Sequence, residues 1–174
     1  SSSSSGTVTA AIVFGGHPGR SITESWNGSA WTEVNDMNQG RFLLGGAGTQ
    51  TSALAFGGDQ SGGGTGYNQT ETWDGTSWTE VNNLGTARYG GAGAGSQSAA
   101  LYSSGVTGST ILSNVESWNG TSWSEVAEVA TAKRKTCGTG TSTAAIKIGG
   151  QPDTTATEEW NVPSSVLNQT ITVG

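Results

Sequence analysis

A tryptophan-containing phrase recurs along this chain of 174 residues. It reads ESWNGSAWTEV at 24–34, ETWDGTSWTEV at 71–81 and ESWNGTSWSEV at 116–126, and a shorter form, EEWN, lies at 158–161. In each full copy, Asn-Gly or Asp-Gly separates two tryptophans, and these dipeptides favour tight hairpin turns because glycine accepts a positive φ without steric cost. The repeat therefore predicts the same β-hairpin in successive structural units, which constrains the fold more than any other feature.

An apolar strand that ends in a glycine pair recurs in step with the hairpin. It reads AIVFGG at 11–16, ALAFGG at 53–58, ALYSSG at 100–105 and AIKIGG at 145–150. The second tryptophan precedes the next glycine-pair position by 26 residues each time, from Trp31 to Gly57, Trp78 to Ser104 and Trp123 to Gly149. Only the segment between the glycine pair and the hairpin varies in length, and insertions are tolerated in surface loops. Each unit should therefore hold rigid strands and one free loop.

Four such units fill the chain, at 1–40, 41–87, 88–132 and 133–174. The last unit lacks the second tryptophan, and its final strand is expected within QTITVG at 169–174. Units of this size with periodic glycine and tryptophan are typical of propeller blades. We therefore predict a single-domain all-β fold, a β-propeller of four blades with four antiparallel strands each, in which small inner strands surround the axis and tryptophans fill the layers between blades. A larger ring that contains these blades is the alternative.

The repeat resembles the kelch repeat over nearly the whole chain. The residues that carry this resemblance are the glycine pairs and the second tryptophans: Gly15-Gly16, Gly57-Gly58, Gly149-Gly150, Trp31, Trp78 and Trp123. The third unit departs from it, with Ser104-Gly105 in place of the glycine pair. More narrowly, the hairpin phrase followed by GAGTQTSALAFGG is similar to Gly/Ser/Thr-rich kelch-like repeats in tail and other virion proteins of bacteriophages. That resemblance implies a virion appendage or surface module.

Composition argues against several partners. The net charge is −6 with only seven Lys and Arg, so nucleic acid is not an expected partner, because its binding depends on neutralising phosphates. The chain has no 18-residue apolar run, so we expect no membrane insertion. Cys137 is the only cysteine. We expect it to be a small buried strand residue, because Gly45 and Ala92 hold its place in other units.

Recurring charged residues predict structural roles. One glutamate opens each hairpin, and we expect these glutamates to form repeated hydrogen bonds or to link blades: Glu24, Glu71, Glu116 and Glu158. A second set precedes a basic residue by eight positions, which predicts repeated ion pairs between Glu33 and Arg41, Glu80 and Arg88, and Glu125 and Lys133. A catalytic group would normally be unique rather than copied into every unit.

No residue pattern predicts catalysis, a metal site or a cofactor. His17 is the only histidine and has no marked partners for a metal site or a catalytic triad. The copper oxidases that carry kelch repeats need a Cys-Tyr-His ligand set that this chain lacks. The glycine-rich stretch at 58–66 lacks the Lys-Ser/Thr ending of a phosphate-binding loop. We therefore expect a protein that is not an enzyme.

The variable loops and the connections between blades should emerge on one face, because strand direction alternates within a blade. Any ligand site is expected there, on His17, Arg20, Arg41, Asp59, Tyr67, Asn68, Arg88 and Asp153; the alternative is that these loops are only solvated. The main functional hypothesis is a homo-oligomeric phage tail-fibre or head-appendage module on the virion surface, which contacts other virion proteins or a host-surface glycan or protein. A secreted bacterial lectin-like propeller is the alternative.

Overall fold

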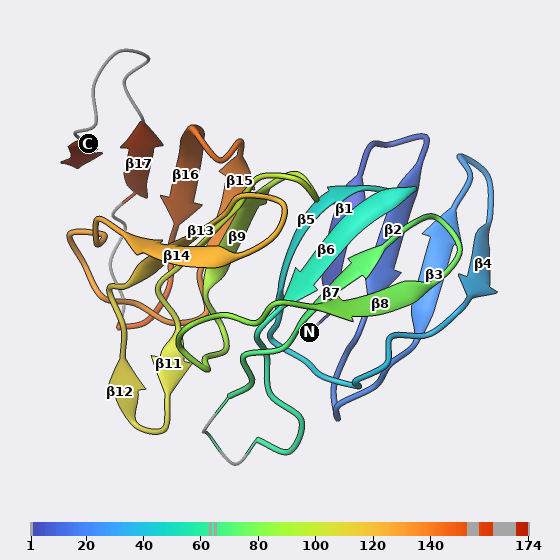
Figure 1. Ribbon diagram of the computed structural model, residues 1–174, viewed down its shortest axis with the longest axis horizontal. Helices are drawn as coiled ribbons and strands as arrows, with labels where there is room; N and C mark the ends of the chain where they lie inside the picture. The colour runs from blue at the N-terminus through green and yellow to red at the C-terminus, as the bar shows by residue number, and fades with distance from the viewer. Residues whose placement is uncertain (1, 63, 65, 153–156, 162–169, 174) are drawn as a thin grey trace.

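The computed structural model describes residues 2–62, 64, 66–152, 157–161 and 170–173. Within them the protein is all-β, with four antiparallel sheets of four strands arranged as the blades of a β-propeller (Figure 1). The predicted fold class is therefore confirmed. No helix in the described part of the chain is long and apolar enough to cross a membrane.

Each blade is built from one continuous stretch of chain, and its strands follow one another outwards from the axis. The first blade holds β1 (Ser3–Gly6), β2 (Ala11–Phe14), β3 (Thr23–Trp26) and β4 (Trp31–Val34). The second holds β5 (Gly45–Thr49), β6 (Ser52–Phe56), β7 (Thr70–Trp73) and β8 (Trp78–Val81). The third holds β9 (Ala92–Gly95), β10 (Ala100–Ser103), β13 (Val115–Trp118) and β14 (Trp123–Val126). The fourth holds β15 (Cys137–Gly140), β16 (Ala144–Ile148), β17 (Thr157–Asn161) and β18 (Thr170–Val173).

The repeated tryptophan phrase forms the predicted hairpin between the two outer strands. In the second blade, Trp73 and Trp78 are paired across the strands with ring centroids 5.4 Å apart. The Asp74 carboxylate closes the turn by accepting hydrogen bonds from the backbone N–H groups of Thr76 and Ser77, both at 2.8 Å. Asparagine does the same in the hairpins of the first and third blades. The local sequence is thus sufficient to fix this turn.

Small residues allow the inner strands to crowd together, as predicted. β1 packs beside β5, β5 beside β9, and β9 beside β15. A Cβ atom on Gly93 would lie 2.8 Å from the carbonyl oxygen of Gly46, and one on Gly138 would lie 2.9 Å from that of Gly93. Any larger side chain at these positions would push neighbouring blades apart.

The first and last blades do not meet in the same way. β4 lies at one end of the long axis of the molecule and β17 near the other (Figure 1). A cavity of about 240 Å³ lies on the axis, lined by Ser3, Gly46, Gly93 and Gly138, among other inner-strand residues. Among the described residues, the inner strands and apolar clusters of consecutive blades pack together, but β1 and β15 do not pack in this way and no apolar cluster joins the first blade to the last.

The core consists of three apolar clusters, and each cluster fills one layer between consecutive blades. Between the first two blades, Ile12 and Phe14 pack against Trp73 and Trp78. The next layer joins residues of β6, such as Phe56, to residues of the third blade, and the last joins the third blade to Trp160 of the fourth. Tryptophans therefore fill the layers as predicted.

One expected burial is wrong. Cys137 lies at the first position of β15, in the predicted strand, but its side chain is exposed. Its counterparts Gly45 and Ala92 are buried because a following blade covers them, and a Cβ on Gly45 would touch Phe56 and Tyr102 of that packed layer. No such layer covers the outward side of the fourth blade in the described structure.

Candidate functional site

The variable loops and the blade connections lie on the same side of the propeller, as predicted. Phe42, in a connection, and Asp59, in a variable loop, exchange two backbone hydrogen bonds of 2.8 Å. Arg134 and Gln151 exchange two backbone hydrogen bonds in the same way, whereas Tyr67 and Arg88 form a bridge in which Arg88 N donates to the carbonyl oxygen of Tyr67 at 3.1 Å. We call this side the loop face and define it by the variable loops 15–22, 57–69, 104–114 and 149–152 and the connections 35–44, 82–91 and 127–136.

Buried ion pairs anchor the connections beneath the loop face. Arg41 Nη2 lies 2.9 Å from Glu71 Oε1, and Arg88 Nη2 lies 2.9 Å from Glu116 Oε1, with all four side chains almost fully buried. Burial lowers the pKa of Arg41, and the charge of Glu71 opposes that shift. The predicted pairings of Arg41 with Glu33 and of Arg88 with Glu80 are wrong, because each guanidinium group points inwards to the glutamate that opens the hairpin of its own blade.

Each of these glutamates also accepts backbone hydrogen bonds from the connection. Glu71 accepts one from Asn38 N at 2.7 Å and one from Gln39 N at 3.3 Å. Corresponding bonds reach Glu116 from the second connection and Glu158 from the third. The predicted blade-linking role of these three residues is confirmed. Glu24, their counterpart in the first blade, is exposed and accepts no such pair of backbone hydrogen bonds from the described part of the chain.

In the fourth blade, a lysine on strand β16 forms an ion pair with the glutamate that opens the hairpin. Lys147 Nζ lies 3.4 Å from Glu158 Oε1 and donates hydrogen bonds to the carbonyl oxygen of Thr131 at 2.8 Å and to Ser104 Oγ at 3.3 Å. Burial lowers the pKa of Lys147. The role of Lys147 was not predicted from the sequence, although a lysine within the otherwise apolar AIKIGG strand was a usable signal. Ser104 has a φ of 63°, so it adopts the left-handed conformation that glycine adopts in the other blades.

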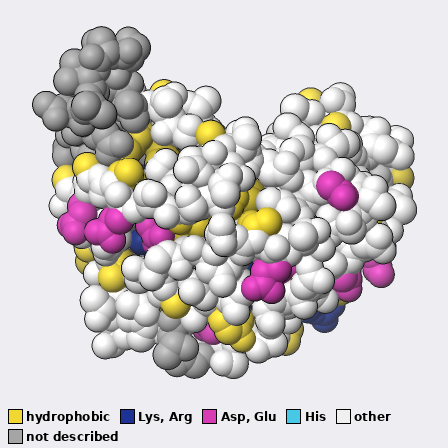
Figure 2. Space-filling model, in the orientation of Figure 1, with side chains coloured by type: hydrophobic (Ala, Val, Ile, Leu, Met, Phe, Trp, Pro, Cys, Tyr) yellow, Lys and Arg dark blue, Asp and Glu magenta, His cyan; other side chains and the backbone are white. Residues whose placement is uncertain are grey.

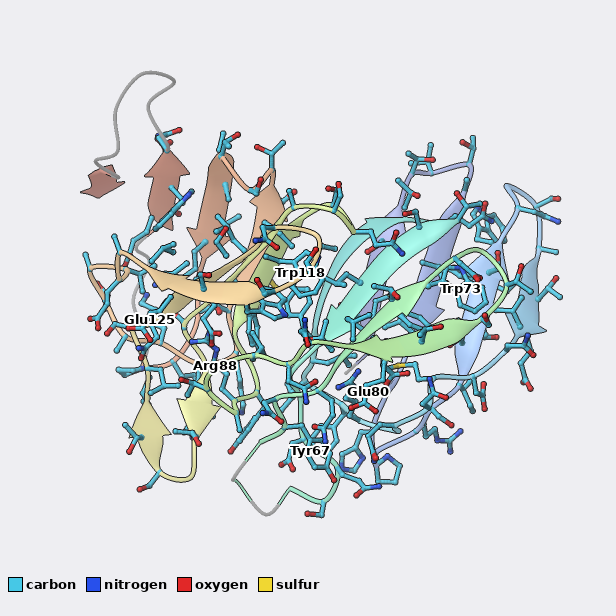
Figure 3. All side chains as sticks on the ribbon, viewed as in Figure 1. Tyr67, Trp73, Glu80, Arg88, Trp118 and Glu125 are labelled. Atoms are coloured by element: carbon cyan, nitrogen blue, oxygen red, sulfur yellow. The ribbon has the colours of Figure 1, made fainter. Side chains whose placement is uncertain are left out.

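Several predicted ligand-binding residues are accessible on the loop face. His17 and Arg20 are exposed, and the His17 ring meets Phe42 edge-on with centroids 5.0 Å apart. Tyr67 lies on the loop face and is partly exposed (Figure 3). Its hydroxyl group donates a hydrogen bond to Gln60 Oε1 at 2.6 Å. Asn68 is half-buried and donates to the carbonyl oxygen of Leu84 at 3.4 Å.

Three of the remaining predicted residues are buried. Arg41 and Arg88 are fully buried in their ion pairs. Asp59 is buried too, and its Oδ1 accepts hydrogen bonds from the backbone of Gln60 and Ser61. Asp153 lies outside the described residues. The structure thus leaves His17, Arg20, Tyr67 and Asn68 as the accessible candidates, and their binding role stays a prediction.

The third variable loop contains a structure that the sequence analysis did not anticipate. It folds into a two-stranded hairpin, β11 (Val106–Thr107) and β12 (Thr110–Ile111), which projects from the loop face (Figure 1). The Gly108-Ser109 turn between two short β-branched stretches was the available signal. Among the described residues, no three His, Cys, Asp or Glu side chains are grouped to hold a metal ion.

Comparison with known proteins supports the fold alone. No family model matches the sequence, and no curated protein matches it significantly. Many solved structures are similar. One of them, YjhT, has a propeller-type fold and matches with a TM-score of 0.70 at 12% sequence identity, over 88% of this chain and 52% of that one. This chain therefore spans about half the length of YjhT.

Proposed function

We propose that this protein is a non-enzymatic recognition module whose loop face binds a glycan or protein on a host-cell surface, as part of a phage tail fibre or head appendage. The observation that carries the proposal is the contrast between the blades and their loops. The strands, tryptophan hairpins and buried ion pairs repeat from blade to blade, whereas the variable loops differ in length, sequence and structure. Function commonly resides in loops that a rigid scaffold positions.

The blades also hold the loops in an ordered conformation before a ligand binds. Backbone hydrogen bonds join each variable loop to a connection, and a buried glutamate accepts hydrogen bonds from the backbone of each connection. Loops that are ordered before binding lose less conformational entropy when a partner arrives. Preorganisation of this kind suits repeated low-affinity contacts with a surface.

The accessible side chains suit a polar, ring-containing ligand such as a glycan. His17 and Tyr67 each offer an apolar ring with a polar tip, and Gln60 and Asn68 add amide groups. Figure 2 shows a surface on which charged side chains are sparse and uncharged groups predominate. Hydrogen bonding and ring stacking, rather than strong charge attraction, would therefore provide recognition.

The virion assignment is supported by the resemblance of the hairpin phrase to phage kelch-like repeats. Antibodies raised against the purified protein should label phage particles in immunogold electron microscopy. Labelling confined to the secreted fraction of a bacterial culture would instead support the lectin-like alternative.

Binding is tested with fluorescently labelled protein on a glycan array and on intact bacterial cells. The double variant H17A/Y67A should lose most of the binding of the wild type. The matched control is Thr79→Ala, on the outer strand β8 and away from the loop face, which should bind as the wild type does. Equal binding by H17A/Y67A and the wild type would exclude these loops as the recognition site.

A further inference from the structure

The interfaces between the first three blades share one set of contacts. Trp78 of the second blade meets Phe14 of the first edge-on, with centroids 4.9 Å apart, and donates from Nε1 to Thr23 Oγ1 at 3.0 Å. The next interface repeats this set, because Trp123 lies 4.9 Å from Phe56 and donates to Thr70 Oγ1 at 3.0 Å. Each interface therefore has a tryptophan half and a receiving half, the latter made of an apolar side chain and a threonine hydroxyl.

The first blade carries a tryptophan half without a receiving half. Trp31 occupies the position of Trp78 but is 47% exposed, against 6% for Trp78. Val8 is 92% exposed and occupies the position of Gln50, whose amide in the second blade reaches back to Ser25 Oγ at 2.9 Å. We call this surface the N-terminal end face; its residues are Val8, Ala11, Val13, Trp26 and Trp31.

The fourth blade carries a receiving half without a tryptophan. Ile148 stands where Phe14 stands in the first blade, and Thr157 stands where Thr23 stands. Ile148 is 47% exposed, whereas Phe14 is fully buried. We call this surface the C-terminal end face; its residues are Cys137, Ile146, Ile148 and Thr157.

The interface between the third and fourth blades provides an internal control. The fourth repeat lacks the second tryptophan, and at the receiving positions the third blade has Ser103 and Val115 instead of an aromatic residue and a threonine. The receiving pair is therefore absent where no tryptophan is to be received. Its presence on the fourth blade, together with Trp31 on the first, makes the two end faces complementary to each other.

We propose that the C-terminal end face of one copy binds the N-terminal end face of a second copy, head to tail. Trp31 then packs on Ile148 and donates its Nε1–H to the Thr157 hydroxyl of the other copy. A second copy of this chain necessarily carries both halves, whereas within one copy the described residues form apolar clusters only between consecutive blades, and none joins the first blade to the fourth. Such a heterologous contact either closes a ring of blades or continues into a longer array.

The test measures mass in solution by size-exclusion chromatography with light scattering. The wild type should form dimers or larger assemblies, and Trp31→Glu and Ile148→Glu should each be monomeric. Mixed in equal amounts, the two variants should form a 1:1 dimer, because one retains the receiving face and the other retains the tryptophan. Thr157→Val should weaken wild-type association roughly fivefold through loss of one hydrogen bond. Near-ultraviolet circular dichroism of each variant verifies folding.

Thr79→Glu is the charge-matched control on the edge strand β8 and should associate as the wild type does. A wild type that is monomeric at all concentrations would overturn the proposal. That result is expected if the two end faces of one copy bind each other, or if other blades cover them. Association of Ile148→Glu alone would also overturn it, since that result requires a symmetric contact. The monomeric variants keep the loop face, so failure here is separable from failure of the proposed recognition function.

Discussion

The interface between the first two blades and the interface between the last two are built from the same repeat but differ in chemistry. The first has an aromatic pair, a tryptophan-to-threonine hydrogen bond and an arginine–glutamate pair at 2.9 Å. The last relies on Leu101, Val115 and Trp160, and its cation is Lys147, 3.4 Å from its glutamate. The indole Nε1 of Trp160 has no hydrogen-bond partner among the described residues.

The difference shows that residues in contact with one another change together from one interface to the next. Where the donor tryptophan is absent, its receptor pair is absent too. Where the fourth blade has Lys147 in place of the valine, alanine or tyrosine of the other blades, that lysine forms an ion pair with the hairpin glutamate. The buried polar groups therefore behave as a network in which one change requires another. The first interface should accordingly be more sensitive than the last to single substitutions.

Trp78→Ala should have the largest effect. It removes a buried indole, its contact with Phe14 and its bond to Thr23, and we expect a loss of about 4 kcal/mol in the free energy of unfolding. Trp31→Ala removes the same side chain from the exposed end of the molecule and should cost less than about 1 kcal/mol. Urea denaturation in the Ile148→Glu background, which keeps the protein monomeric, measures both. Equal losses would contradict the difference between filled and unfilled positions.

Arg41→Met should come next, with a loss of about 3 kcal/mol, because it leaves the buried carboxylate of Glu71 without its cation. Adding Glu71→Gln should recover part of this loss. Lys147→Met also leaves a buried carboxylate, that of Glu158, without the cation beside it, but the contact it removes is longer, 3.4 Å against 2.9 Å, so the loss should be smaller, about 2 kcal/mol. The same denaturation series tests all three, and a Lys147→Met loss as large as that of Arg41→Met would remove the distinction between the two interfaces.

Most of the fold could be predicted from the sequence because it is encoded locally and repeatedly. The turn residues around Asp74 predict one hairpin, and the apolar stretch before Gly57 predicts one strand. Because both recur in each repeat, the sequence predicts a series of similar blades. The partners of Arg41 could not be predicted, because the choice between Glu33 and Glu71 depends on which way the side chain points once the blades pack. Cys137 shows the same limit, since the repeat predicts its strand but not whether another blade covers it.

The candidate site was less predictable than the fold. The loop face followed from strand alternation, and His17 and Arg20 are exposed on it as expected. Burial of Arg88 and Asp59 depends instead on tertiary hydrogen bonds, such as the backbone bridge between Tyr67 and Arg88, which leave no signal in the sequence of the loops.

Replacing a tryptophan by phenylalanine should distinguish the interface that contains Trp118 from the one that contains Trp160. Trp118→Phe loses a hydrogen bond of 2.8 Å to the carbonyl oxygen of Gln97, so the free energy of unfolding should fall by about 1 kcal/mol beyond the packing loss. Trp160→Phe loses no such bond and should show only the packing loss. Thermal unfolding monitored by circular dichroism compares the two variants. A Trp160→Phe loss as large as that of Trp118→Phe would indicate a partner for the Trp160 indole.

The smallest expected effect is on the pH dependence of stability, to which the hairpin turn of the second blade contributes and the turns of its neighbours do not. Hydrogen bonds from the backbone of Ser77 and Thr76 lower the pKa of Asp74. Its stabilising contribution is therefore complete above the unfolded pKa of about 3.9 and is lost as pH falls through the lower folded value. Asparagine closes the equivalent turns at Asn27 and Asn119.

Asp74→Asn should therefore match the wild type at neutral pH but lose less stability under acidic conditions, because its amide does not titrate. The reciprocal variant Asn119→Asp should add the same acid sensitivity to the third blade. Unfolding midpoints measured over a pH series give both comparisons. If Asp74→Asn and the wild type respond identically to acid, the turn carboxylate gains nothing from these bonds, and the hairpin owes its shape to glycine and the paired tryptophans alone.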